Sequence, residues 1–487
     1  METINGLIKR SIPAGSFGRN VVTLMTGTTF AQLLLILVSP ILTRLYSPDD
    51  FGIFALYASI LGILSVVACW RYELAIVLPE KDEDAANLLA LSVLICVGMA
   101  TFTIVMKGIF RRQVADLLSA PDLANWLWLM PLSLLAVGLF QAFNYWSTRR
   151  KQFKRLAVRQ ITRSSVAVVT QIGLGTINTP ALAGGLILGD LAGQVAASSR
   201  LAWQIHRDDY LYLKRISIKG ATEQAIIYKE FPLYQIWAAI LNAFSTMTPV
   251  LLLGYFFSPA IVGLYALGQK VVSSPMGIIG GSFFQVLFPQ AELAHRQGTL
   301  DKLVILTFRQ LLSIGLFPIA TLAIIGPEII GLFFGADWVQ AGVYLRLLSP
   351  YLLFNFLSSP ISSVFSILGK QKEYLIFNVV YIILATSALV YGGLNDDAQL
   401  AIALFGGMNF LLYSYFGALI FKMSGVIWGE VWSAVSPVLM NVIGFIIPIL
   451  FIKFLIDQPV LMIVLCLTLT GAYFIYVFTG KRRINAL

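Results

Sequence analysis

The chain has 487 residues, of which 58% are hydrophobic and 12% are charged, and its formal net charge is +10. Soluble domains carry about a quarter charged residues, so this composition excludes a disordered chain, a collagen-like fibre and a disulfide-rich scaffold. A water-soluble fold could not bury so many large apolar side chains. The composition therefore predicts an all-α polytopic membrane protein.

Apolar segments recur along the whole chain, each close to the length of about 20 residues that a bilayer-spanning helix needs. They predict about 14 transmembrane helices, near residues 20–43, 51–77, 85–106, 125–147, 157–178, 181–204, 233–255, 260–288, 303–325, 340–368, 374–393, 398–421, 431–456 and 459–479. A charged stretch after the sixth helix suggests a division into two six-helix lobes. The expected parts are an N-terminal lobe (1–205), a cytoplasmic linker (206–232), a C-terminal lobe (233–422) and a last part with two helices and a basic tail (423–487).

The basic residues between these helices are distributed unevenly. With this helix count, 22 Lys and Arg residues lie on one side of the membrane and five on the other. The positive-inside rule places the basic side, with both termini, in the cytoplasm. This asymmetry explains the net charge. A nucleic-acid-binding protein would carry its basic residues with stacking aromatics on a soluble domain, and the sequence shows no such domain.

Two segments resemble each other beyond their hydropathy. Ser47–Leu56 and Ser258–Leu267 both read S-P-x-x-x-G-x-[FY]-A-L, and they open the second and eighth predicted helices. Pro fits the first turn of a helix, and Gly permits a close approach between helices. Chance similarity is one explanation. A genuine repeat would instead indicate two parallel-related lobes around a central cavity, which is a common transporter architecture.

Ionisable residues within the predicted spans are mostly basic. Seven Lys and Arg residues lie in or near spans, whereas the only acidic ones are Glu73 and Asp190. A charge inside a bilayer costs a few kcal/mol unless it snorkels, pairs or faces water. Arg159 lies near an inner helix end and is expected to snorkel. The cationic excess favours an anionic ligand such as a phosphate or diphosphate, whereas a cation pump would show the reverse balance.

Lys270 is the cation expected to lie deepest. It is about 15 Å from the start of the eighth helix, and Ser274 follows one turn later on the same face. Asp190 lies near the middle of the sixth helix, with Gln194 four residues further on. Two hypotheses stay open here, a buried Lys270–Asp190 pair that holds helices together and a hydrated cavity with a cationic surface.

Arg71 and Glu73 form a second polar position near the inner end of the second predicted helix. They are two residues apart in a segment expected to be helical. Residues at this spacing do not share a helix face, so the two side chains are expected to point to different sides.

Four segments resemble the Wzx-type oligosaccharide flippases: Thr43–Gly52, Arg71–Pro79, Tyr145–Arg155 and Leu264–Pro289. These flippases belong to the multidrug/oligosaccharidyl-lipid/polysaccharide (MOP) exporter superfamily, together with lipid II flippases and multidrug antiporters. The resemblance implies two six-helix lobes in a V, with the first, second, seventh and eighth helices lining a cavity.

The same resemblance implies a function and a place in the cell. The substrate would be a polyprenyl-diphosphate-linked oligosaccharide, an O-antigen or exopolysaccharide repeat unit, moved by alternating access across a bacterial cytoplasmic membrane. Arg44, Arg71 and Lys270 match cationic positions that line the cavity in the lipid II branch. The lipid bilayer and the polysaccharide polymerase machinery would be the remaining partners.

Two other functions compete with a flippase. An ion-coupled drug antiporter of the same fold would use Glu73 or Asp190, with Gln194 and Ser274 nearby, as sodium or proton sites. A membrane polymerase or glycosyltransferase would place carboxylates or His with Arg on a large outer loop, and the predicted outer loops show no such pattern. No disulfide or metal-ligand spacing is visible among the three cysteines. The sequence therefore predicts a transporter, not an enzyme, without metal or organic cofactor.

Overall fold

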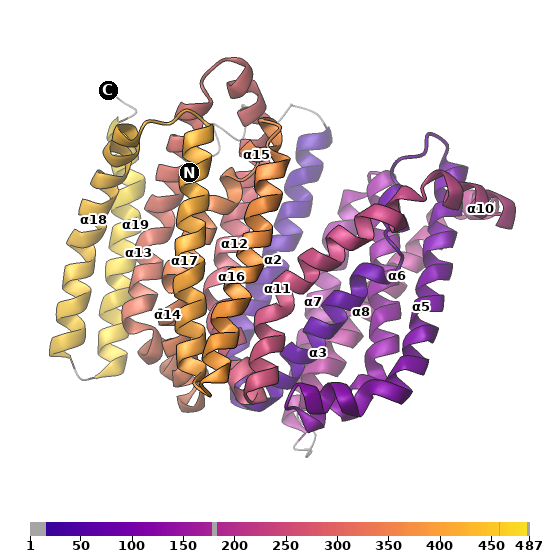
Figure 1. Cartoon of the computed structure of the whole chain (residues 1–487), viewed down its shortest axis with the longest axis horizontal. Coiled ribbons are helices and arrows are strands. Elements are labelled where there is room, and N and C mark those ends of the chain that lie inside the picture. The colour runs from indigo at the N-terminus through magenta and orange to yellow at the C-terminus, as the bar shows by residue number, and fades with distance from the viewer. Residues whose placement is uncertain (1–15, 178–182, 457, 485–487) are drawn as a thin grey trace. The chain divides into compact units, whose positions relative to one another are not determined.

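The computed structural model describes residues 16–177, 183–456 and 458–484, and within these ranges the regular structure is helical. Fourteen helices there have 20 or more residues (Figure 1). They are α2 (Ser16–Leu45), α3 (Pro48–Val67), α5 (Asp82–Leu117), α6 (Met130–Arg149), α7 (Phe153–Thr176), α8 (Ala183–Asp208), α11 (Ile236–Phe256), α12 (Pro259–Arg296), α13 (Leu300–Phe334), α14 (Val339–Ile361), α16 (Gln371–Leu394), α17 (Ala398–Met423), α18 (Trp428–Leu455) and α19 (Pro459–Ile484).

Shorter elements connect these helices. They are α4 (Tyr72–Ala75), α9 (Tyr210–Leu213), α10 (Ile218–Ile227), α15 (Val364–Ile367), and the 3-10 or π segments η1 (Pro121–Asn125), η2 (Leu127–Leu129), η3 (Phe231–Gln235) and η4 (Ala336–Trp338). The two chain ends, predicted to be cytoplasmic, lie outside the described residues.

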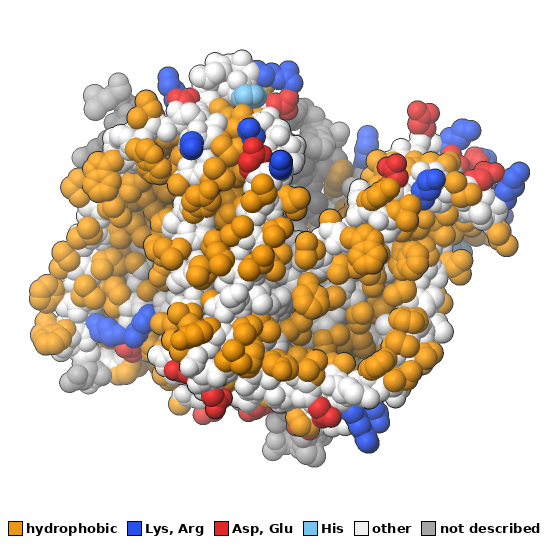
Figure 2. Space-filling model, in the orientation of Figure 1, with side chains coloured by type: hydrophobic (Ala, Val, Ile, Leu, Met, Phe, Trp, Pro, Cys, Tyr) orange, Lys and Arg blue, Asp and Glu red, His pale blue; other side chains and the backbone are white. Residues whose placement is uncertain are grey.

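Ten of the long helices in the described chain are long and apolar enough to cross a membrane: α2, α3, α5, α6, α11, α13, α16, α17, α18 and α19. Figure 2 shows the matching surface, with apolar side chains over the middle of the visible face and most charged ones near the helix ends. The protein is thus a multi-pass membrane protein. The other four long helices, α7, α8, α12 and α14, contain Arg163, Asp190, Lys270 and Arg346 respectively.

The chain forms two compact units, residues 1–263 and 264–487. In the first unit, α7 packs on α2 and α8, α5 pairs with α6, and α3 contacts α8 and α11. In the second unit, α14 packs against α13 and α17, and α18 and α19 both pack on α13 (Figure 1). Because α11 packs on α3, the boundary between the two compact units falls after residue 263, which is later than the predicted linker (206–232). The division into two six-helix lobes itself stays a prediction.

The predicted linker contains ordered helices docked on the first unit. Helix α10 packs on α5. The Ser217 amide donates to Asn87 Oδ1 at 2.9 Å, and the Tyr72 hydroxyl donates to the Ala225 carbonyl at 3.0 Å. The linker is therefore fixed to the start of α5 and to the segment that carries Arg71.

A cluster of ion pairs joins the ends of α5, α6, α7 and α8. Asp209, with only 4% of its side chain exposed, lies 3.3 Å from Arg150 and 3.1 Å from Arg155, and it accepts a hydrogen bond from Trp146 Nε1 at 3.1 Å. Arg150 also reaches Asp82 at 2.7 Å. The basic run after α6, which the sequence presents as an orientation signal, is therefore also a structural cluster.

The two copies of the repeated sequence motif meet in space. A Cβ on Gly52, in the first copy, would clash with the carbonyl oxygen of Pro259 in the second copy. A Cβ on Gly263 would in turn clash with the carbonyl oxygen of Pro48. The first turns of α3 and α12 thus approach each other through a reciprocal glycine–proline contact that only glycine allows.

Candidate substrate-binding site

The segment that carries Arg71 is a turn and not part of a continuous helix. The predicted helix 51–77 is wrong in being continuous, since α3 ends at Val67 and the short helix α4 begins at Tyr72. Trp70 and Arg71 between them have φ values of 50° and 65°. This left-handed conformation costs a non-glycine residue about 1–2 kcal/mol, so the surrounding packing must hold the turn in place.

The turn brings Arg71 and Glu73 together, which corrects the expectation that they point apart. Arg71 NH1 lies 3.8 Å from Glu73 Oε1, and their side chains are 26% and 2% exposed. Among the described residues, Arg71 Nε and Glu73 Oε2 have no hydrogen-bond partner. The ion pair is therefore long, and the carboxylate and the guanidinium each keep one buried atom without a hydrogen bond in the described chain.

Asp190 pairs with Arg163 on the neighbouring helix. Arg163 NH2 on α7 lies 3.3 Å from Asp190 Oδ1 on α8, and both side chains are partly exposed. Gln194 is buried, and its Oε1 has no partner in the described chain. The Lys270–Asp190 pair considered from the sequence stays a prediction, as does the role of Gln194.

Arg159 does not snorkel as expected. It is buried, its guanidinium lies 4.1 Å from the centre of the Phe140 ring, and NH1 donates to Asn144 Oδ1 at 2.5 Å. A cation–π contact and a side-chain amide therefore replace water around this charge. The sequence could not show this because the partners lie on the preceding helix α6.

The remaining predicted cations lie at accessible positions of their own units. In the first unit, Arg44 is exposed in the last turn of α2. In the second unit, Lys270 is exposed on α12, and Ser274 is half-buried one turn further along.

Two other cations, Arg346 and Lys453, contact a kink in α13. Ile325 has non-helical angles (φ −114°, ψ 20°), and Pro327 two residues later has no N–H to offer the Ala323 carbonyl. Arg346 Nε donates to the Ala323 carbonyl at 2.9 Å, and NH2 donates to the Ile324 carbonyl at 3.3 Å. Arg346 therefore satisfies backbone groups that the kink releases.

Lys453 on α18 completes this arrangement. It also donates to the Ile324 carbonyl, and its Nζ lies 3.0 Å from Glu328 Oε1. These contacts give Arg346 and Lys453 structural partners. Pro327 is the residue from which the kink in α13 could have been predicted, because a proline inside a helix leaves a carbonyl without its N–H donor.

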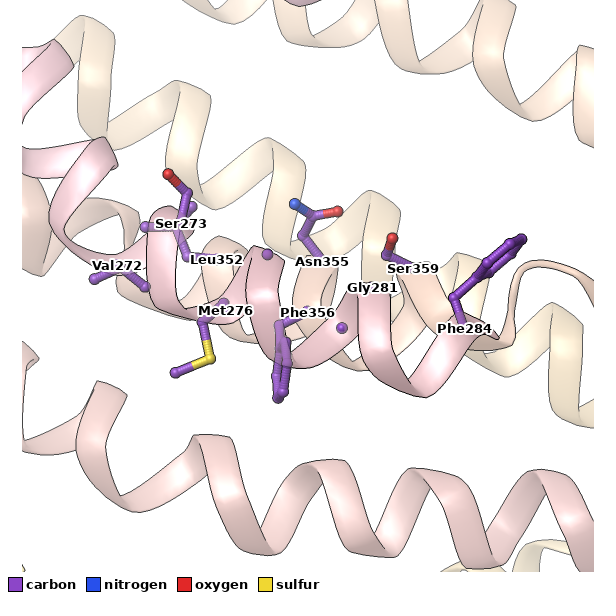
Figure 3. A pocket seen from close by; sticks show the side chains of 11 residues that line it. Val272, Ser273, Met276, Gly281, Phe284, Leu352, Asn355, Phe356 and Ser359 are labelled. Carbon is purple, nitrogen blue, oxygen red and sulfur yellow. The ribbon is translucent and has the colours of Figure 1, made fainter. Parts of the chain in front are cut away.

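A cavity of about 410 Å³ opens between α12 and α14 in the second unit (Figure 3). Its polar lining comes from Ser273, Asn355 and Ser359, and its apolar lining includes Met276 and Phe356. None of these five residues could be assigned to a cavity from the sequence, because nothing in a single sequence pairs a turn of α12 with a turn of α14.

Solved structures define the class to which this fold belongs. The fold resembles the lipid II flippase MurJ in its inward closed conformation, with a TM-score of 0.72 and 12% identity over 95% of this chain and 99% of that one. It also resembles the inward-facing conformation of a multidrug resistance MATE family transporter of the MOP superfamily, with a TM-score of 0.60 and 14% identity over 82% of this chain and 98% of that one. The protein has the MOP transporter fold.

Sequence comparison gives the family. Residues 41–343 match the family described as polysaccharide biosynthesis protein, so the chain belongs to this Wzx-like family. It is 22% identical over 397 residues to the succinoglycan biosynthesis transport protein ExoT of Rhizobium meliloti (strain 1021), covering 77% of this chain and 75% of that protein. The resemblance seen in the sequence is confirmed, and the family is one of transporters in polysaccharide biosynthesis, not of enzymes.

Proposed function

We propose that this protein is a flippase that moves a polyprenyl-diphosphate-linked oligosaccharide from the cytoplasmic to the outer leaflet of a bacterial cytoplasmic membrane. The substrate would be an exopolysaccharide or O-antigen repeat unit, and both termini would face the cytoplasm. Membership in a polysaccharide biosynthesis family and the MOP fold support this proposal. The observation that carries it is Lys270, a lysine exposed in the interior of the long helix α12.

The head group and the lipid tail would take separate paths. Lys270 would hold the diphosphate as a point charge, and Arg71 and Arg44 would supply further donors as the lobes rearrange. The sugars would occupy a hydrated cavity, while the prenyl tail stays in lipid. Each state can prefer the ligand only modestly, because tight binding to one state would prevent release on the other side.

The test is Lys270→Ala in proteoliposomes with a short-chain prenyl-diphosphate oligosaccharide, read out as the fraction of glycan reached by an impermeant lectin. Loss of Lys270 should reduce translocation to the protein-free rate, with normal membrane abundance and unfolding temperature. Lys372→Ala, at an exposed position at the start of α16, is the charge-matched control. Wild-type translocation by Lys270→Ala would remove this residue from the site.

Glu73 supports a second function, that of an ion-coupled small-molecule antiporter. Its carboxylate is buried and incompletely paired, as a proton or sodium site could be. Asp190 is the other candidate for coupling. Transport of a cationic dye driven by a sodium or proton gradient, without glycan translocation, would favour this function over the flippase.

A further inference from the structure

The cavity between α12 and α14 has the size and the lining of a small-molecule site. Its volume of about 410 Å³ lies within the range of roughly 300–1,000 Å³ that is typical of ligand pockets. The pocket is lined from two helices of the same unit, so its geometry does not depend on how the two units are arranged.

One wall of the cavity offers neutral hydrogen-bonding groups. In Figure 3 the polar ends of Ser273, Asn355 and Ser359 point to the same side. Ser273 and Ser359 are exposed and Asn355 is half-buried, and no side-chain hydrogen bond ties these three to another described residue. Two hydroxyls and one amide can each donate and accept, which matches the neighbouring hydroxyls of a sugar ring.

The other wall is apolar. Met276 and Phe356 point to the opposite side in Figure 3, and Phe284 lies at one end of the lining. Apolar and aromatic walls with a few placed polar groups are the usual composition of a site for a neutral organic ligand. Among the described residues, no Lys, Arg, Asp or Glu lines this cavity, so the lining suits an uncharged sugar better than a uronic acid.

Two glycines keep the cavity open. A Cβ on Gly277 or Gly281 would meet nothing within 4 Å among the described residues, so helix packing does not require glycine there. Glycine inside a helix costs roughly 0.5–1 kcal/mol relative to alanine. Because they carry no side chain, Gly277 and Gly281 leave the cavity beside α12 unfilled.

The cavity begins one turn from Lys270. Ser273 is three residues and Gly277 seven residues after Lys270, so they lie about 4.5 Å and about 10 Å along the same helix face. We propose that the α12–α14 cavity binds the neutral sugar directly linked to the diphosphate, with the diphosphate at Lys270. This inference rests on the proposed function and assigns a subsite to it.

The experiment compares two ligands on the full-length protein in nanodiscs: a short-chain prenyl diphosphate that carries one neutral hexose, and the same prenyl diphosphate without sugar. Wild-type protein should bind the hexose-bearing ligand about tenfold more tightly, as two or three hydrogen bonds allow. Gly277→Leu fills the cavity and Asn355→Ala removes its amide. Each should abolish that advantage while the affinity for the sugar-free ligand stays within about twofold.

The matched control is Gly444→Leu, because Gly444 is also a helical glycine with nothing within 4 Å, but on α18 outside the cavity. It should keep the tenfold preference. Equal binding of the two ligands by wild-type protein, or an undiminished preference in both cavity variants, would overturn the subsite while leaving the flippase proposal intact. Failure of wild-type protein to bind either ligand would overturn both proposals.

A prenyl diphosphate carrying glucuronic acid should bind no better than the sugar-free ligand, and tighter binding would contradict a neutral subsite.

Discussion

Individual cations in this protein differ in what surrounds them. Arg159 lies over Phe140, and Arg346 donates to two backbone carbonyls of α13. Arg71 is held in a left-handed turn beside Glu73, and its side chain is 26% exposed. The number of cations in spans therefore overstates the positive charge available to a ligand, because Arg159 and Arg346 contact groups of neighbouring helices instead.

Arg346 gives a prediction at this scale. Arg346→Met should lower the unfolding temperature by about 2–6 °C, because it leaves two carbonyls at the α13 kink without their donors. Thermal unfolding of the detergent-purified protein measures the effect. Pro327→Ala restores an N–H near the Ala323 carbonyl, so Arg346→Met should cost less in that background. An equal cost in both backgrounds would show that Arg346 acts through something other than the kink.

Residue identities predicted the charge balance but not the partners. Lys270, Arg44 and Arg71 are exposed or partly exposed, as a cationic surface requires. The pairing of Arg163 with Asp190 was not predicted, because it depends on the rotation of α7 against α8. The Arg71–Glu73 pair was missed because the argument from helical spacing fails where two residues adopt positive φ.

Helices α3 and α12 show how one sequence pattern can build a contact between elements. Gly52 and Gly263 each face the proline carbonyl that opens the other helix. Each copy of the motif supplies both halves of the contact, a glycine that approaches and a proline that is approached. The sequence repeat is thus also a spatial pair.

Gly52→Ala should force the first turns of α3 and α12 apart. The neighbouring atom is a backbone oxygen that cannot rotate away, so we expect a cost of about 1–3 kcal/mol, the usual range for overpacking. Unfolding temperature and membrane abundance are the measurements. Gly98→Ala on α5 is the control, since a Cβ there meets nothing within 4 Å and should be tolerated. Equal stability of both variants would contradict the close approach.

Element boundaries were predicted least well where polar or proline residues interrupt an apolar run. The predicted helix 303–325 continues as α13 to Phe334, because the break at Ile325 is a kink and not an end. The predicted helix 51–77 is shorter, because the chain turns at Trp70 and Arg71. In both cases hydropathy located the element, and backbone angles that hydropathy does not encode decided its end.

At the scale of the whole molecule, composition alone was enough for the class. Apolar runs predicted an all-helical multi-pass membrane protein, and the motif segments indicated its family and, through that resemblance, the MOP fold. Ten of the predicted spans in the described chain are helices long and apolar enough to cross a membrane. The cavity could not be predicted, because it depends on the packing of α12 against α14, which are joined only through α13.

The ion-pair cluster around Asp209 ties four helices of the first unit and gives a prediction for its integrity. Asp209→Ala should leave Arg150, Arg155 and Trp146 without a shared acceptor and cost about 3–5 kcal/mol, as the loss of one member of a buried pair does. Chemical unfolding and protease resistance of the detergent-purified protein measure this. Asp209→Asn keeps a hydrogen-bond acceptor and should be milder. A fully stable Asp209→Ala protein would show that the cluster is dispensable.

The docked linker also offers a way to watch this protein work. The three native cysteines are all buried, so a cysteine engineered at the exposed Ile226 would be the preferred target of a thiol-reactive fluorophore. That dye would sit beside Ala225, whose carbonyl accepts the hydrogen bond from Tyr72, the neighbour of Arg71. Its emission would therefore report movements of the turn at Trp70 and Arg71 in real time. The dye itself would lie outside the bilayer and outside the translocation path.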